Sequence, residues 1–223
     1  MNVLARTSAV LVKDLLSEIR TRYALNALLM FIITAVAIIL FALRGDTPGT
    51  VVLAGMFWVV VFFTGMSGLS RIFVSEEERG TALTLQLLAP PGVVYFGKLA
   101  FNVLLTLVLV AGVTAVYLVA FPGFIIQTPS IFFVTLLLGS LGLASAATII
   151  AAIVAKAGSR GTLYPVLSFP VVVVLLMTVM NATVKSLDGE EFSAAIVDFV
   201  VLISYVMVMT AGSFLLFEFV WKD

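Results

Sequence analysis

The sequence of 223 residues contains no cysteine and no histidine. Without cysteine, the chain can form no disulfide, no thiolate metal site and no cysteine nucleophile. Without histidine, it also lacks the commonest metal ligand and general base of proteins. Charged residues make up 11% of the chain, against about 25% in an ordinary soluble domain. These absences exclude an ordinary soluble domain, and no metal site is predicted.

Hydrophobic residues make up 62% of the chain, and the mean hydropathy is +1.25. They fall into runs of about 20 residues, the length at which an α-helix crosses a hydrocarbon core of about 30 Å. We therefore expect an all-α polytopic membrane protein, with one transmembrane domain over residues 1–223 and six transmembrane helices. The expected spans are residues 23–43, 50–70, 99–121, 131–155, 163–184 and 199–220.

Residues 1–22 precede the first span and are too polar to cross the membrane. The apolar face of this segment comprises Leu4, Leu11, Leu15 and Ile19, and its polar face comprises Arg6, Lys13, Ser17 and Arg20. This spacing is typical of an amphipathic helix that lies in the membrane interface. The alternative is a juxtamembrane lead-in with no function of its own.

Lysine and arginine are unevenly divided between the two sets of connections. Ten of the twelve lie in the terminal segments and in residues 71–98 and 156–161, whereas the opposite connections hold Arg44 and Lys185. Because basic loops stay in the cytoplasm, both termini are expected to be cytoplasmic. The acidic segment around residues 185–198 on the other side is interpreted as a simple linker or, alternatively, as a re-entrant segment.

The densest charge cluster lies between the second and third spans. It consists of Glu76, Glu77, Glu78 and Arg79. Ser75 is placed as an N-cap with Glu78 closing a capping box, and Pro90 and Pro91 stop a helix. The pattern predicts one short helix over residues 75–89, lying on the membrane surface. The alternative is a solvated charge run that only ties two spans together.

Small residues in the fourth span allow close helix packing. They include Gly139, Ser140, Gly142 and Ala144. We interpret them as a helix interface within one chain, with a dimer seam as the alternative.

In the fifth span, Pro165 falls in the first turn, where it is tolerated, and Pro170 lies about two turns in, where proline kinks a helix. Such a kink is either a hinge or a matter of shape.

No ionisable residue lies at the centre of a predicted span. Secondary transporters and proton pumps hold such residues to bind their coupling ions. No catalytic constellation at membrane depth and no phosphate-binding G-x-x-x-x-G-K-[ST] motif occurs either. Any energy for transport is therefore expected to come from a partner.

A set of sequence blocks extends over nearly the whole chain. They are K-D-L-L-S-E-I-R-T-R-Y-A-L-N at 13–26, G-L-S-R-I-F at 68–73, E-E-E-R-G-T at 76–81, L-L-A-P at 87–90, G-K-L at 97–99, G-S-L-G at 139–142, Y-P at 164–165, F-P at 169–170 and L-F-E-F at 216–219. On these blocks the chain resembles the CcmB family, also called haem exporter protein B, the membrane subunit of the cytochrome c maturation system. The block at 76–81 is shared loosely with many ABC-2-type permeases, and the block at 13–26 makes the resemblance specific.

The resemblance implies a permease subunit with an ABC-2 or type V exporter fold in a bacterial or organellar inner membrane. In this family two copies pair with two copies of a cytoplasmic ATPase, CcmA, and associate with the membrane proteins CcmC and CcmD. The complex is linked to delivery of haem to the periplasmic chaperone CcmE. Haem is thus the implied cargo, and ATP is expected on the partner. The chain itself is expected to be no enzyme, to hold no cofactor and to bind no nucleic acid, and axial haem ligands are expected on partners.

In permeases of this type a coupling helix between the second and third spans seats in a cleft of the ATPase. The resemblance assigns this role to residues 75–89, with Glu76, Glu77, Glu78, Arg79, Gly80, Thr81, Leu83 and Leu87 as the coupling residues. Residues 1–22 resemble the connecting helix of the same fold. Two other functions stay open, namely an ABC-2 permease for another cargo and a scaffold of a haem-handling complex that transports nothing.

Overall fold

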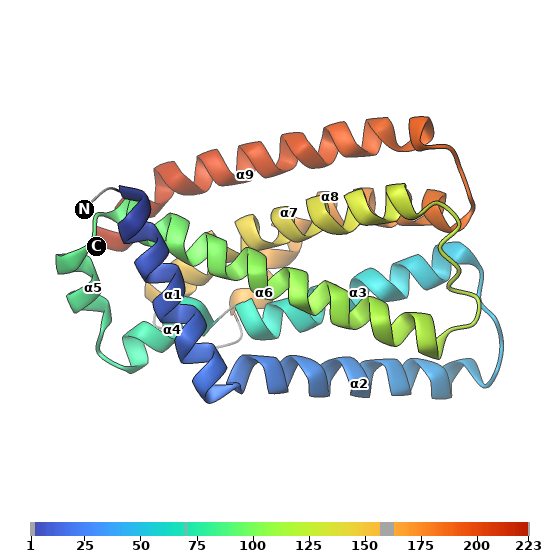
Figure 1. The fold of residues 1–223 in the computed structure, drawn as a ribbon, viewed down its shortest axis with the longest axis horizontal. Helices are drawn as coiled ribbons and strands as arrows, with labels where there is room; N and C mark the ends of the chain where they lie inside the picture. Colours follow the sequence, from blue (N-terminus) through green and yellow to red (C-terminus); the bar gives the residue numbers. More distant parts are fainter. Residues whose placement is uncertain (1–2, 70, 157–162, 223) are drawn as a thin grey trace.

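The chain folds into a bundle of long helices (Figure 1) in a computed structural model that describes residues 3–69, 71–156 and 163–222. The elements are α1 (Val3–Thr21), α2 (Tyr23–Leu43), α3 (Thr50–Leu69), α4 (Arg71–Glu78), α5 (Ala82–Leu88), α6 (Pro91–Ala120), α7 (Pro129–Lys156), α8 (Leu163–Leu187), the 3-10 helix η1 (Phe192–Ala195) and α9 (Ile196–Lys222). Within these described ranges there is no strand, and six helices are long and apolar enough to cross a membrane. The prediction of an all-α polytopic membrane protein with six spans is confirmed.

The spans begin and end close to the predicted residues. The first coincides with α2, and the second, predicted at 50–70, corresponds to α3. The third begins at Pro91 rather than at residue 99, because proline fits the first helical position and nothing afterwards interrupts the helix. The segment after α8 is a short linker: the N–H of Glu190 donates to the carbonyl of Lys185 at 3.0 Å, and η1 leads directly into α9. The re-entrant alternative is therefore wrong.

Helix α7 packs against α6, α8 and α9. A Cβ atom added at Gly139 would lie 2.7 Å from the ring of Trp58, and one added at Gly142 would lie 2.6 Å from Leu175. Ser140 and Ala144 are fully buried beside them. The small residues of the fourth span thus lie at helix interfaces within the chain.

Polar side chains join neighbouring spans in the interior. The indole Nε1 of Trp58 in α3 donates to Thr183 Oγ1 in α8 at 2.8 Å, and Asn102 Nδ2 in α6 donates to Thr148 Oγ1 in α7 at 2.8 Å. Helix α8 contains Pro165 in its first turn and continues through Pro170. A kink at these prolines stays a prediction.

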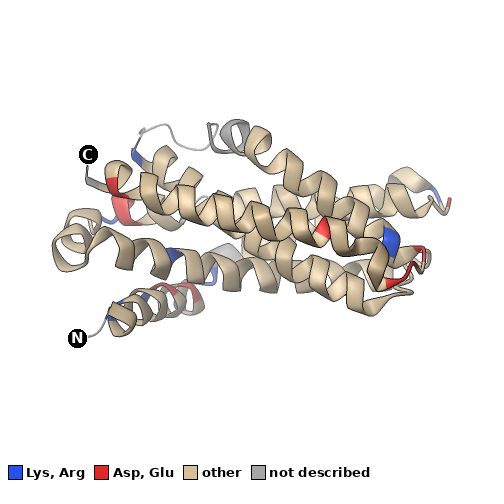
Figure 2. Cartoon of the chain, turned by 90° about the horizontal axis from the view of Figure 1, so that it is seen from above, with Lys and Arg blue, Asp and Glu red and all other residues tan. Residues whose placement is uncertain are grey.

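Both termini lie at one end of the bundle, together with α1, α4 and α5 (Figure 1). We call this the terminal end, and the end that carries the α2–α3, α6–α7 and α8–α9 connections the opposite end. Figure 2 shows that the charged residues lie mainly at these two ends and leave the middle of the bundle largely uncharged. This distribution of charge is the one expected of a membrane protein. The terminal end also carries the helices α1, α4 and α5, which lie outside the bundle of long helices.

Candidate functional site

The connection between α3 and α6 forms two helices at the terminal end, α4 and α5, and α1 crosses beside them (Figure 1). Helix α1 lies against the start of α6 because residue 97 is a glycine. A Cβ atom there would be 2.7 Å from Cβ of Val10 and 3.2 Å from the carbonyl oxygen of Thr7. The missing side chain therefore lets the backbones of α1 and α6 approach closely.

The prediction of one helix over residues 75–89 is wrong, because α4 ends at Glu78 and α5 begins at Ala82. Gly80, with φ +67°, follows the last turn of α4 in the left-handed conformation. Its N–H donates to Glu77 O at 3.1 Å and that of Thr81 to Glu76 O at 3.0 Å, a Schellman motif that ends the helix.

Ser75 likewise does not act as the predicted N-cap. It lies inside α4, where its hydroxyl donates to the carbonyl of Ile72 at 3.4 Å. The capping box with Glu78 is therefore absent, and the chain is already helical when it reaches the glutamates. Pro91 does separate the second short helix from the third span, as predicted, since α6 begins there.

A buried cation on the third span holds this region together. Lys98 of α6 is only 1% exposed, and its Nζ lies 2.8 Å from Oε1 of Glu76 in α4 and 3.0 Å from Oδ2 of Asp14 in α1. The same Nζ donates to the carbonyl of Ile72 at 3.1 Å. One ammonium group thus joins three elements that are far apart in sequence.

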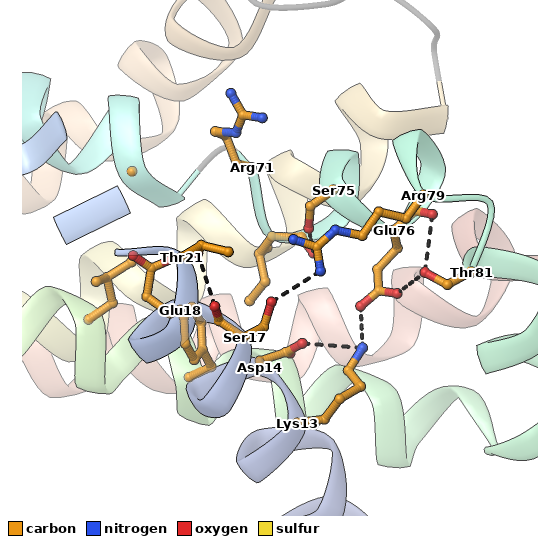
Figure 3. A pocket seen from close by; sticks show the side chains of 14 residues that line it. Lys13, Asp14, Ser17, Glu18, Thr21, Arg71, Ser75, Glu76, Arg79 and Thr81 are labelled. Atoms are coloured by element: carbon orange, nitrogen blue, oxygen red, sulfur yellow. Dashed lines mark hydrogen bonds and ion pairs between the residues drawn. The ribbon is translucent and has the colours of Figure 1, made fainter. Parts of the chain in front are cut away.

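The two carboxylates have further partners at the rim of the cluster (Figure 3). Lys13 forms an ion pair with Glu76 and lies 3.3 Å from Asp14, and Thr81 Oγ1 donates to Glu76 Oε2 at 2.5 Å. Burial by itself would lower the pKa of Lys13, but the hydrogen bond and attraction to Glu76, together with Asp14, raise that pKa above its ordinary value. Lys13 is therefore cationic.

We call Lys13, Asp14, Glu76 and Lys98 the charge cluster. Two cations face two carboxylates, so the cluster is neutral as a whole. Buried charges are tolerated only when they are paired and hydrogen-bonded, and removing one partner leaves an uncompensated charge. The cluster therefore fixes the position of α4 relative to α1 and α6.

The predicted coupling residues fall into two groups. Glu76 is 6% exposed and its oxygens contact Lys13, Lys98 and Thr81, so the prediction that it pairs with charges on an ATPase is wrong. Glu77, Glu78 and Arg79 are exposed. Among these, Glu78 pairs with Arg71 at 3.4 Å, and Arg79 Nη1 donates to Ser17 at 3.1 Å. Gly80 and Thr81 form the turn rather than a contact surface.

Helix α5 presents an uncovered apolar face. Leu83 is 72% and Leu87 87% exposed, and Leu88 beside them is 74% exposed. The helix is tied down on its other side, where Gln86 Nε2 donates to the carbonyl of Trp221 at 2.6 Å. This face can bind an apolar surface on a partner or on the membrane.

Sequence reasoning missed Asp14 and Lys98 as site residues. The available signal was the position of Asp14, which is one residue before Leu15 and three after Leu11 on the side of α1 expected to be apolar. In the structure Val10 and Asp14 are the buried residues of that helix. Lys98 had been counted only among the basic loop residues.

Over residues 3–69, 71–156 and 163–222, no group of three or more Asp or Glu side chains is arranged to hold a metal ion. The chemistry available to the site consists of ion pairing and apolar contact. An element of this kind can bind a partner and transmit a displacement.

Comparison with known protein families gives a match to the family model described as "CcmB protein", over residues 5–221. The match covers nearly the whole chain, including most of α1, the charge cluster and all six spans. No curated protein and no solved structure matches the chain significantly.

Proposed function

Because the chain belongs to the CcmB family, the membrane permease components of haem export in c-type cytochrome biogenesis, we propose that it is the permease subunit of an ATP-driven ABC complex. The complex delivers haem to a periplasmic CcmE-like chaperone. ATP binds to a separate CcmA-like subunit, and CcmC-like and CcmD-like proteins complete the assembly, which contains two copies of this chain. The protein lies in the inner membrane with the terminal end in the cytoplasm.

The observation that supports ATP coupling is the combination of an exposed α5 and an anchored α4. The leucine face of α5 is uncovered, so it is available to a cleft on an ATPase. Helix α4 is joined to α6 by the ion pair of Glu76 with Lys98 at 2.8 Å. A displacement of the α4–α5 connection would therefore reach the third span and α1 through rigid, buried contacts rather than through a slack loop.

The distribution of basic residues supports the proposed orientation. Arg44 follows α2 and Lys185 lies in the last turn of α8, both at the opposite end, whereas the described residues of the terminal end include Lys13 of α1, Arg71 of α4 and Arg79 after α4. Basic connections favour the cytoplasm, which is where an ATP-hydrolysing partner must lie.

The test is charge reversal at the two exposed glutamates, Glu77→Lys with Glu78→Lys. Surface substitutions of this kind change the free energy of unfolding by only about 0.5 kcal/mol, so the protein should still insert and fold. We expect two quantities to fall together in this variant. One is the amount of co-purified ATPase, measured as ATP hydrolysis per mole of permease, and the other is the level of c-type cytochromes. The matched control is Glu190→Lys with Glu191→Lys, an exposed acidic pair at the opposite end, which should leave both unchanged.

Normal cytochrome c levels in the stably inserted Glu77→Lys, Glu78→Lys variant would refute the coupling role of this surface. If, in addition, an ATPase subunit that cannot hydrolyse ATP still supported cytochrome maturation, the non-transporting scaffold would be the correct function.

A further inference from the structure

Helix α2 lies at one edge of the bundle (Figure 1), where it contacts α3 and α6. Its buried side chains within residues 25–43 are Leu28, Ile32 and Val36. They recur every fourth residue and therefore form one face of the helix. The opposite face of this span has no neighbour within one chain.

The uncovered face carries a set of residues spaced alternately by three and four positions. They are Ala27, Met30, Thr34, Ala37 and Phe41, all exposed except Ala37, which is half-buried. At about 100° per residue, this set lies on the side of α2 that faces away from the buried side chains. Such spacing averages about 3.5 residues, the repeat with which two helices pack side by side in a left-handed crossing. We call these five residues the α2 seam.

Thr34 of the seam lies in the middle of α2 and therefore near the centre of the bilayer. In other spans, threonine hydroxyls donate to the carbonyl four residues earlier. Thr114 donates to Val110 at 2.8 Å, and Thr178, which is also exposed, donates to Val174 at 2.9 Å. The hydroxyl of Thr34 makes no such bond and has no other hydrogen-bond partner among the described residues. Because hydrocarbon offers neither donor nor acceptor, this hydroxyl needs a partner from outside the chain.

A second copy of this chain satisfies the hydroxyl. In a pair related by a two-fold axis perpendicular to the membrane, both copies cross the bilayer in the same direction, so equivalent residues lie at equal depth. Thr34 then meets Thr34 of the second copy. A hydroxyl group both donates and accepts, so the two side chains can hydrogen-bond to each other. The small side chains of Ala27 and Ala37 allow the two helix backbones to approach closely.

A groove beside the seam can receive a side chain of the second copy. It has a volume of about 470 Å³ and an apolar lining that includes Ala37 and Leu40 of α2 and Ala115 and Val119 of α6. Phe41 directly follows Leu40 and is 84% exposed, so in a parallel pair it lies at the depth of the groove of the other copy. An aromatic ring packed in the groove gains contact area that it lacks in the single chain. The face is therefore self-complementary.

We propose that the α2 seam is the surface through which two copies of this chain bind each other in the membrane. Helix α2 of one copy packs against α2 of the other, with the two Thr34 hydroxyls paired near the bilayer centre. The inference rests on the two copies of the proposed function and adds the span that joins them.

The test is disulfide cross-linking of single-cysteine variants of the full chain in native membranes, with its partners present. The chain has no cysteine, so each variant carries one thiol, and a disulfide-linked dimer joins equivalent residues of two copies. Thr34→Cys and Phe41→Cys should cross-link on oxidation, because seam positions of a parallel pair come within the Cα separation of about 4.4–6.8 Å that a disulfide needs. Two exposed positions serve as matched controls and should not cross-link, Leu29→Cys in α2 outside the seam and Val208→Cys in α9.

A second series tests the hydroxyl itself in the Phe41→Cys background. Thr34→Val should lower the cross-linked fraction roughly threefold, the usual contribution of a hydrogen bond between helices in a membrane. Thr34→Ser keeps the hydroxyl and should cross-link like the parent variant. The matched control, Thr178→Val, changes an exposed threonine that is bonded to Val174 of its own helix and should have no effect.

Three results would overturn the proposal. Cross-linking at Leu29→Cys or Val208→Cys without cross-linking at Thr34→Cys and Phe41→Cys would show that the copies meet through another face. Cross-linking of Phe41→Cys to a different protein would show that another membrane subunit covers the seam. Absence of any dimer would show that the seam does not join two copies. Co-purified ATPase and cytochrome levels, measured in the same membranes, report on the proposed function separately from the cross-links.

Discussion

Replacing Lys98 by methionine would remove the fully buried cation of the charge cluster while keeping a long, unbranched side chain. Asp14, 9% exposed, and Glu76, 6% exposed, would then face each other with only the half-buried Lys13 between them. Losing one partner of a buried ion pair costs about 3–5 kcal/mol, because the remaining charge is left without compensation. We expect this free energy to appear as loosening of α1 and α4 from α6.

Limited trypsin digestion in detergent measures this loosening directly. The bond after Arg79 lies in the exposed turn between α4 and α5, so its cleavage reports opening of that connection. A loss of about 3–5 kcal/mol corresponds to an opening constant roughly 10²–10⁴ times larger. Cleavage in Lys98→Met should therefore be far faster than in the wild type, and thermal unfolding should begin at a lower temperature.

The double variant Glu76→Gln, Lys98→Met distinguishes charge from packing. It removes one charge of each sign and leaves Lys13 3.3 Å from Asp14, so much of the lost stability should return. Lys156→Met changes an exposed lysine at the end of α7 and should behave like the wild type. If Lys98→Met matched the wild type in both cleavage and unfolding, the anchoring role of the cluster would be refuted.

Two further predictions concern packing, both measured by thermal unfolding in detergent. Gly97→Ala should lower the free energy of unfolding by about 1–3 kcal/mol, because the added Cβ would lie 2.7 Å from the branched Cβ of Val10. The control, Gly212→Ala in α9, meets no atom within 4 Å and should be neutral or stabilising. Equal effects of the two substitutions would contradict the close approach of α1 and α6. Thr183→Val should lower the free energy of unfolding by about 1–3 kcal/mol, because it leaves the indole N–H of Trp58 unpaired. Thr183→Ser keeps the hydroxyl and should unfold like the wild type. If the valine variant had the wild-type unfolding midpoint, the hydrogen bond would contribute nothing to stability.

The spans could be predicted because every helix that crosses the hydrocarbon core needs about 20 apolar residues, however the helices pack against one another. Residues 50–70 were expected to cross the membrane, and α3 covers 50–69. The start of α6 was placed too late because residues 91–98 include Tyr95 and Lys98, which interrupt the apolar run without interrupting the helix. Hydropathy predicts the apolar part of a helix and does not predict how far the helix continues into polar residues.

The exposure of Leu4, Leu15 and Ile19 agrees with the prediction of an amphipathic helix that lies in the membrane interface. The sequence pattern did not show which residues of α1 pack toward the bundle, and in the structure these are Val10 and Asp14. In a soluble protein the apolar face of a helix covers the core. Beside a bilayer the lipid offers an equally apolar environment, so the polar groups turn inward to find partners.

The charge cluster could not have been predicted from spacing. Asp14 and Lys98 are 84 residues apart, and nothing in the local pattern pairs them. The break in the coupling segment was visible in principle, since Gly80 directly follows a helical run and glycine is the usual residue at that position. The family resemblance located the functional region, and the pairing of its residues required the three-dimensional arrangement.

The order of the cluster along the chain has a consequence for biosynthesis. Both carboxylates precede Lys98, with Glu76 22 residues ahead of it. A ribosome adding about 5–20 residues per second produces Glu76 roughly 1–4 s before Lys98. Lys98 is therefore synthesised after Asp14 and Glu76, the two carboxylates that neutralise it. The third span can then be inserted with the charge of its lysine already paired.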